Sequence, residues 1–297
     1  MSNKLRKMTL EKKHNLTGWA FLAPATFLIA VFSFWPMIKA LVLSFQTGKG
    51  RNMQMAGFTN YIRMFQDDVF IQSIKNTFFY FILQVPIMLV VALVLACILN
   101  KKDLRFKGFF RTMIFLPCTT SLVAYSIIFR SLFANNGLVN YVLVNIGILD
   151  KPYNFLTQPF AAKIVIILAL LWRWTGYNMV FFLSGLQNIE YSVYEAAKID
   201  GASAIQTFFK ITVPLLKPTI LLTAIMSTNG TLQLFDESIN LTDGGPANAS
   251  ISMSHYIYNL CFKYVPNFGY AAAMSFFILL LVAVLAFIQM RVGDKRD

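Results

Sequence analysis

Six apolar runs, each long enough to cross a lipid bilayer, dominate this sequence of 297 residues. A helix needs about 20 apolar residues to cross roughly 30 Å of hydrocarbon. The chain is 57% hydrophobic and only 13% charged, which is more apolar surface than a water-soluble domain needs. The sequence therefore predicts an all-α integral membrane protein, a single domain over residues 1–297, with transmembrane helices at about 18–45, 76–99, 109–133, 160–186, 217–239 and 268–290.

The basic residues indicate which ends of these helices face the cytoplasm. Sixteen Lys and Arg residues lie at the two termini and in the connections near residues 101–111 and 198–217, against seven in the other connections. Because cytoplasmic loops carry the excess of Lys and Arg, both termini and the loop at about 187–216 are predicted to be cytoplasmic. The net charge of +13 is thus a topology signal and not a nucleic-acid footprint. The first apolar run is longer than a signal-peptide core, which favours a retained anchor.

The loop at 187–216 has the pattern of two short helices joined by an elbow. Two capping boxes are predicted, Ser192-x-x-Glu195 and Ser203-x-x-Gln206. Gly201 lies between them, where a chain leaving a helix commonly adopts the left-handed conformation that glycine adopts at low cost. Pro214 is expected to end the second helix before the next apolar run begins.

The other connections show turn signals. The external loop from Gln46 to Lys75 is expected to turn at Gly57 into an amphipathic helix on the membrane surface. A second external loop, from Ala134 to Pro159, contains turn sequences, and a third has a tight turn at Asp243-Gly244-Gly245-Pro246. The three cysteines and the isolated residues His14 and His255 show no metal, redox or catalytic spacing.

Helix five is unusually polar for a spanning segment, and unpaired polar side chains in hydrocarbon tend to face a cavity or another helix. Its polar residues fall on two faces: Thr223, Ser227, Thr231 and Ser238 on one, and Asn229, Gln233 and Asp236 on the other. One face is expected to line a water-filled path and the other to contact a neighbouring helix. On chemical grounds, Gln233 and Asp236 are the better binders of paired hydroxyls.

Helix four contributes a second polar cluster, Trp172-Arg173-Trp174-Thr175-Gly176-Tyr177-Asn178. Thr175, Tyr177 and Asn178 can bond to the hydroxyl groups of a ligand, and the two Trp rings either stack on the apolar face of a ligand ring or form a packing layer. Because a buried guanidinium needs a carboxylate, Arg173 is hypothesised to pair with Asp236 or Glu237 on the next helix.

Four groups of residues carry a family resemblance. Glu195-Ala196-Ala197, three residues, Gly201, nine residues and Ile211-x-Val213-Pro214 resemble the coupling loop of ABC importer permeases. Phe110-Arg111-Thr112, Thr242-x-Gly-Gly-Pro-Ala-Asn and Phe268-Gly269-Tyr270-Ala271 resemble the carbohydrate-uptake branch, in particular the larger membrane subunit of the maltose transporter. The extra amino-terminal helices and large external domain of that subunit have no counterpart in this sequence, so contacts that depend on that domain are not carried over.

The resemblance implies the type I ABC importer permease fold and a multi-pass protein of a bacterial-type cell membrane. It implies a second homologous permease, two cytoplasmic ATPase subunits, an extracytoplasmic substrate-binding protein and a carbohydrate substrate. The residues expected to couple to an ATPase are Glu195, Ala196, Ala197, Asp200 and Gly201. For helix five, the resemblance favours the Ser227 and Thr231 face as the substrate path, and Gln233 and Asp236 remain candidates.

The chain is expected to be a transport subunit and not an enzyme. It has no Walker A string, so no cofactor is expected on this chain, and ATP and Mg belong to the partner subunits. Glycerol phosphate or a polyol is an alternative substrate, although an anion would call for more than one cavity-facing cation and only Arg173 qualifies. An ion-coupled secondary transporter is less favoured because inverted repeats and broken helices are not evident, and a membrane enzyme because no catalytic set is present.

Overall fold

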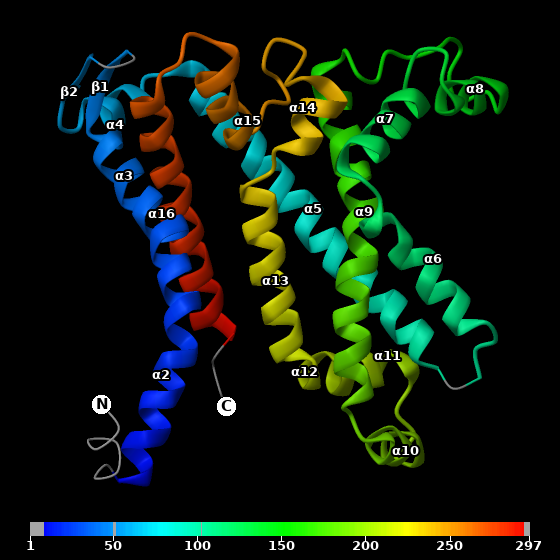
Figure 1. The fold of residues 1–297 in the computed structure, drawn as a ribbon. Coiled ribbons are helices and arrows are strands. Elements are labelled where there is room, and N and C mark those ends of the chain that lie inside the picture. Colours follow the sequence, from blue (N-terminus) through cyan, green and yellow to red (C-terminus); the bar gives the residue numbers. More distant parts are fainter. Residues whose placement is uncertain (1–8, 50–51, 102, 294–297) are drawn as a thin grey trace.

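A computed structural model describes residues 9–49, 52–101 and 103–293 of the chain. The described part is mostly helical (Figure 1). Four helices are long and apolar enough to cross a membrane, and two further bent pairs of helices bring the number of candidate spans to as many as six. The predicted cytoplasmic termini, residues 1–8 and 294–297, lie outside the described residues.

The first span is longer than predicted. It consists of α2 (Leu10–Ile29), a π-helical turn η1 (Ala30–Phe34) and α3 (Trp35–Ser44). α3 packs against the last helix, α16 (Phe268–Gly293), whereas the apolar side chains of α2 are exposed. The predicted start at residue 18 was too late because polar residues such as Lys12 and His14 precede the apolar run within the same helix.

The centre of the bundle is formed by α5 (Asp68–Asn100) and α9 (Pro159–Gln187), which pack along each other more extensively than any other pair of helices. Buried side chains such as Met88, Met179 and Phe182 fill the space around this contact. Gly176 allows α9 to approach the helix at Lys107–Thr119 closely, because a Cβ atom there would lie 1.9 Å from the carbonyl oxygen of Ile114. The predicted helices at 76–99 and 160–186 are confirmed, with α5 beginning eight residues earlier than predicted.

The prediction of one continuous helix at 109–133 was wrong. This segment forms α6 (Lys107–Thr119) and α7 (Leu122–Leu132), which are bent by 99° relative to each other. Pro117 cannot donate a backbone hydrogen bond and disfavours continuation of the helix, and Thr120 is extended with ψ 153°. The sequence reasoning counted these residues as part of an apolar run and missed the break.

The prediction of one helix at 217–239 was also wrong. α13 (Lys217–Leu232) ends before Gln233, and a separate helix, α14 (Asp236–Thr242), follows after Phe235, whose φ is −134°. Asp236 and Ser238 therefore do not continue the helical faces of Ser227 and Thr231. A helical projection carried through residues 233–235 cannot describe how these side chains are arranged.

The remaining elements lie in the connections. β1 (Gln46–Lys49) and β2 (Asn52–Met55) form an antiparallel hairpin, and α4 (Thr59–Met64) follows Gly57, whose φ of +55° confirms the predicted turn. α8 (Leu138–Asn145) lies between α7 and α9, while α15 (Met253–Tyr258) and the π-helical turn η3 (Asn259–Lys263) precede α16. The hairpin and α8 were not predicted, because both are short elements within segments taken as loops.

Candidate functional site

The loop at 187–216 folds into short helices at one end of the bundle. They are α10 (Tyr191–Ile199), α11 (Ala204–Thr207), the π-helical turn η2 (Phe208–Thr212) and α12 (Val213–Leu215). Figure 1 shows α10 at the end of the bundle opposite α14, α15 and the β1–β2 hairpin. The beginning of α2 and the end of α16 lie toward the same end as α10.

Gly201 forms the predicted elbow between α10 and α11. Its φ is +74°, in the left-handed region that favours glycine. The amide of Ala202 donates to the carbonyl of Ala197 at 2.9 Å, and the amide of Gly201 donates to the carbonyl of Lys198 at 3.2 Å. These two bonds are the Schellman pattern of a helix end, so the positive φ at Gly201 is part of how α10 stops.

One of the two predicted capping boxes is present. The Ser203 hydroxyl accepts from the amide of Gln206 at 3.3 Å, and the Gln206 side chain accepts from the amide of Ser203 at 2.8 Å. The Ser192 box was wrong: α10 begins at Tyr191, two residues earlier than that box requires, and the Ser192 hydroxyl donates to Glu190. Pro214 lies inside the helical segment Ala204–Leu215 and does not end it.

The predicted coupling residues form an exposed surface on α10. Glu195, Ala196 and Asp200 are exposed, and only Ala197 is buried. Two apolar side chains on the same short helices are also largely exposed, Ile199 at 86% and Ile205 at 71%. The sequence reasoning missed these two, although an isoleucine next to a charged turn is a signal for an exposed apolar contact.

A cavity of about 310 Å³ lies between α5, α9, α13 and α14. Its polar lining residues are Gln84, Tyr177, Asn178, Ser227, Thr231, Gln233, Asp236 and Glu237. Its remaining lining is apolar or aromatic: Met88, Leu122, Leu170, Trp174, Met226, Gly230, Leu234 and Phe235. An apolar pocket with a few converging polar groups is the usual form of a small-molecule site.

Six of the seven residues predicted for the substrate path line this cavity. Tyr177 and Asn178 come from α9, Ser227 and Thr231 from α13, and Gln233 and Asp236 from the segment that follows. α13 ends at Leu232, and the change of direction after it places Gln233 and Asp236 at the same cavity as Ser227 and Thr231. The two faces that the helical projection separated thus meet around one space.

Thr175 does not reach this cavity. Trp174, Tyr177 and Asn178 have the i, i+3, i+4 spacing of one helical face, and Thr175 is turned about 100° from Trp174. Thr175 lines a second recess of about 430 Å³ with mostly apolar residues of α5, α6 and α9.

Gln84 is a cavity residue that the sequence reasoning missed. Its side-chain carbonyl accepts from the Thr231 hydroxyl at 2.8 Å, and its amide approaches the Met88 sulfur at 3.0 Å. Across the cavity, the Ser227 hydroxyl donates to the Asn178 amide oxygen at 3.3 Å. Gln84 is the only amide residue between residues 77 and 99, and such an isolated polar residue in an apolar run is the signal that could have found it.

Arg173 does not form the predicted ion pair with Asp236 or Glu237. Its guanidinium donates to the carbonyl oxygens of Thr120 at 2.9 Å and Cys118 at 3.3 Å, at the break between α6 and α7. The last carbonyl groups of a helix have no partner within it, and hydrocarbon offers none. The broken span thus supplies the acceptors that the sequence reasoning looked for in a carboxylate.

Aromatic rings enclose the Arg173 guanidinium. It lies 4.8 Å from the ring centroid of Tyr125 and 5.3 Å from that of Trp174. Trp172 stacks on Tyr125 at 6.2 Å and contacts Phe129, which agrees with the packing-layer interpretation for this ring. Trp174 is the tryptophan that lines the cavity.

Glu237 connects the broken span to the cavity wall. It is buried, and its carboxylate accepts a hydrogen bond from the Tyr125 hydroxyl on α7. α14, which carries both Asp236 and Glu237, packs against α7. The position of this part of the cavity wall therefore depends on the bend that Arg173 stabilises.

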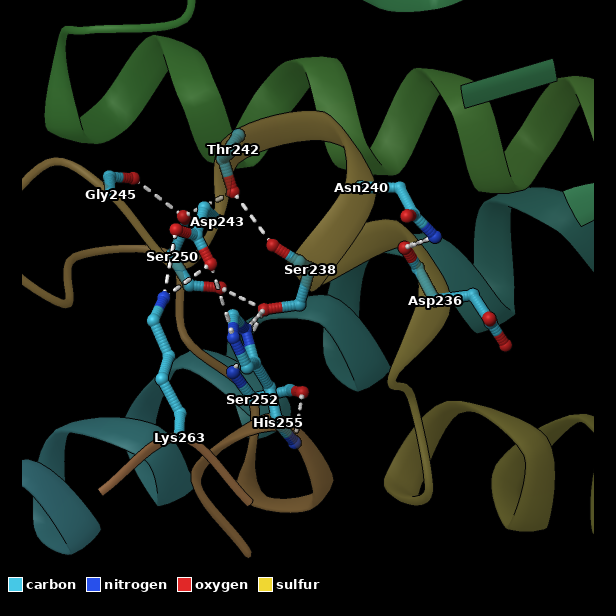
Figure 2. A network of polar contacts seen from close by, with 10 residues as sticks. All are labelled: Asp236, Ser238, Asn240, Thr242, Asp243, Gly245, Ser250, Ser252, His255 and Lys263. Atoms are coloured by element: carbon cyan, nitrogen blue, oxygen red, sulfur yellow. Dashed lines mark hydrogen bonds and ion pairs between the residues drawn. The ribbon is translucent and has the colours of Figure 1, made fainter. Parts of the chain in front are cut away.

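His255 is not isolated, which corrects the expectation from sequence. Figure 2 shows it within a polar network that holds α14, α15 and the turn between them. The Ser238 hydroxyl lies 2.9 Å from His255 Nδ1, and Asp243 lies 3.7 Å from Nε2 and bonds to Lys263 at 2.9 Å. Burial lowers the pKa of His255 to about 4, although Asp243 opposes that shift, so the imidazole is neutral at pH 7.

This network fixes the shape of the turn after α14. The Ser250 hydroxyl donates to the carbonyl of Gly245 at 2.6 Å, and the Ser252 hydroxyl donates to the carbonyl of Leu234 at 2.5 Å. The predicted turn at Asp243 and Gly244 is confirmed, and both residues have positive φ. The hydroxyl groups of Ser238, Ser250 and Ser252 all take part in hydrogen bonds within it, so the network supports the position of α14.

A family model described as "Binding-protein-dependent transport system inner membrane component" matches residues 27–296. The lactose transport system permease protein LacF of Rhizobium radiobacter is 52% identical to the chain over 292 residues, which cover 98% of this chain and 98% of the relative.

Two solved structures share the fold. A bacterial ABC transporter involved in the import of the acidic polysaccharide alginate contains a chain with a TM-score of 0.84 and 24% identity, covering 97% of this chain and 98% of that one. A bacterial alginate ABC transporter, solved in complex with an alginate pentasaccharide-bound periplasmic protein, gives a TM-score of 0.83 and 26% identity, covering 96% of both chains.

Proposed function

This chain belongs to the family of binding-protein-dependent transport system inner membrane components, and on that premise we propose that it is the permease subunit of an ATP-driven carbohydrate importer. The observation that carries the proposal is the 310 Å³ cavity, in which amide, hydroxyl and aromatic side chains converge between α5, α9 and α13. Amides and hydroxyls bond to sugar hydroxyls, and Trp174 and Tyr177 offer faces for the apolar side of a pyranose. The identity to a lactose transport permease supports a sugar as substrate.

The proposed topology has six spans, in which α6 and α7 together cross once and α13 crosses after the loop at 187–216. α10 lies at the same end of the bundle as the start of α2 and the end of α16, which agrees with a cytoplasmic side that holds both termini and the loop at 187–216. The excess of Lys and Arg in those connections supports the same orientation. The protein is then a multi-pass component of the inner membrane.

The proposed assembly contains a second homologous permease, two cytoplasmic ATPase subunits and an extracytoplasmic binding protein. ATP and Mg are bound by the ATPase subunits, and this chain holds no cofactor. α10 docks on an ATPase through the exposed residues Glu195 and Ala196 and the elbow at Asp200 and Gly201, whereas Ala197 is buried within the chain. Closure of the ATPases moves the attached helices as rigid bodies and switches access to the cavity from outside to inside.

A glycerol phosphate or polyol importer is the alternative within the same family. Membership of the family removes the ion-coupled secondary transporter and the membrane enzyme as interpretations. Glycerol phosphate is an anion, whereas sugars and polyols are neutral, and direct uptake measurements with one compound of each class separate the three.

The test is uptake by proteoliposomes that contain this chain with its partner permease, ATPases and binding protein. ATP-dependent accumulation of a neutral sugar such as lactose is expected, and none of a glycerol phosphate. The isolated chain in detergent is expected to bind no sugar with micromolar affinity, because one permease supplies only half of the enclosure. Accumulation without ATP, or of glycerol phosphate alone, would contradict the proposal.

A further inference from the structure

The cavity is lined by acidic side chains and by no basic ones among the described residues. Asp236 and Glu237 line it, and no Lys, Arg or His is among the residues that line it in the described part of the chain. Resting on the proposed carbohydrate function, we propose that this cavity selects uncharged sugars over acidic ones, and that Asp236 determines this selectivity. Uronates and sugar phosphates are the excluded class, and a sugar that carries an amine is accepted.

Arg173, whose guanidinium lies against the ring of Trp174, is close enough for its charge to act on the buried Glu237. Its guanidinium is 5% exposed, does not line the cavity, and donates to the carbonyls of Cys118 and Thr120. The rings of Tyr125 and Trp174 flank it. The Arg173 guanidinium donates hydrogen bonds to the carbonyls at the break between α6 and α7, and its side chain does not enter the cavity where an anionic sugar would bind.

The two carboxylates have different roles. Glu237 is 4% exposed and accepts from the Tyr125 hydroxyl, so it is held within the wall. The Asp236 carboxylate has no hydrogen bond or ion pair within the described chain, and Figure 2 shows it directed away from the His255 network. Asp236 contributes only its backbone carbonyl to local structure, as the acceptor for the Asn240 amide at 2.9 Å.

A carboxylate without a partner attracts hydroxyl donors of a substrate and repels its anionic groups. Its two oxygens accept from paired sugar hydroxyls, and charge-assisted bonds of this type are stronger than those between neutral groups. A substrate carboxylate or phosphate in the same space meets like charge at low dielectric, with no basic side chain among the described residues that line the cavity. Gln84, Asn178 and Gln233 supply neutral donors and acceptors that do not reverse this preference.

The fold alone does not impose this selectivity. A transporter involved in the import of acidic alginate has the same fold at 24% identity, so exclusion of acidic sugars has to come from the side chains that line the cavity. A change of one such side chain is therefore sufficient to shift the charge preference without a change of architecture.

The experiment compares lactose with two derivatives of similar size: lactobionate, in which the reducing glucose is oxidised to an open-chain carboxylate, and the amine-bearing lactosamine, with neutral open-chain lactitol as the control for loss of the ring. Binding is measured by calorimetry on the complete membrane complex in nanodiscs, with the binding protein left out so that its own selectivity does not intervene. The wild-type complex is expected to bind lactobionate at least roughly tenfold more weakly than lactose, and lactosamine at least as well as lactose.

Asp236→Asn is expected to remove most of that difference and Asp236→Lys to reverse it. Asp150→Asn, a change at an exposed carboxylate in the α8–α9 connection, is the matched control and should leave the order unchanged. Equal binding of lactose and lactobionate by the wild type, or an unchanged order in Asp236→Lys, overturns the selectivity proposal while the carbohydrate function stands. If the complete complex neither binds nor transports any sugar, the proposed function itself fails.

Discussion

Gly201→Val is expected to abolish ATP-driven uptake while the chain still inserts and assembles with its partner permease. The residue has a φ of +74°, and an added Cβ would meet no atom within 4 Å, so the defect is conformational and not a steric clash with a neighbour. Left-handed backbone costs a non-glycine residue about 1–2 kcal/mol, and more when the residue is β-branched. The Schellman bonds at the end of α10 would be lost, and α10 would no longer be presented at the correct angle.

The measurement is the ratio of sugar accumulated to ATP hydrolysed in proteoliposomes. Gly201→Asn is the matched control, because asparagine tolerates the left-handed region, and it should retain most of the coupling. Normal substrate-stimulated ATPase activity and uptake in Gly201→Val would show that the elbow does not transmit the motion.

Arg173→Gln is expected to lower the thermal stability of the complex and its rate of uptake together. The change removes the guanidinium from the carbonyls of Cys118 and Thr120, and each buried polar group left without a partner costs about 1–3 kcal/mol. The bend between α6 and α7 would shift, and with it the contact between Tyr125 and Glu237 that holds the cavity wall.

The readout is the unfolding temperature in detergent, with Arg130→Gln, at an exposed position near the end of α7, as the control. Removing Asp236 should not rescue the Arg173 variant, because the two side chains form no ion pair. Full recovery of stability in the double variant, or an unchanged unfolding temperature in Arg173→Gln, would contradict the role assigned to Arg173.

The long apolar runs and the Gly201 elbow could be predicted because each has a strong local cause. About 20 apolar residues determine a span, and a glycine between a helix end and Ser203 with its Gln206 partner determines a turn. The breaks at Thr120 and at Gln233–Phe235 could not be found in the same way. Both segments lie inside runs that are long enough to be taken as one spanning helix, and Pro117 and the polar residues around Gln233 do not by themselves indicate where the helix ends.

The cavity shows the same division between local and tertiary causes. Ser227 and Thr231 were found as one helical face, whereas their meeting with Gln233 and Asp236 depends on the end of α13. The partner of Arg173 was predicted incorrectly because the need of a buried cation can be met by backbone carbonyls, and sequence alone does not reveal where these are exposed. Gln84 was not predicted because a single amide in an apolar helix is a weaker signal than the clustered polar residues of helices four and five.

The central claim is that substrate is held in the cavity near the end of α13 that adjoins α14, and that energy enters through α10, beyond the opposite end of α13 (Figure 1). Its most direct test is to measure uptake and ATP hydrolysis side by side for Thr231→Leu and Glu195→Ala in the reconstituted complex. Thr231→Leu should keep assembly and basal ATP hydrolysis but lose uptake or change the sugar that is carried. Glu195→Ala should weaken ATPase association or coupling and leave the sugar preference unchanged. Normal uptake of the usual sugar by Thr231→Leu, or an altered sugar preference in Glu195→Ala, would contradict the account.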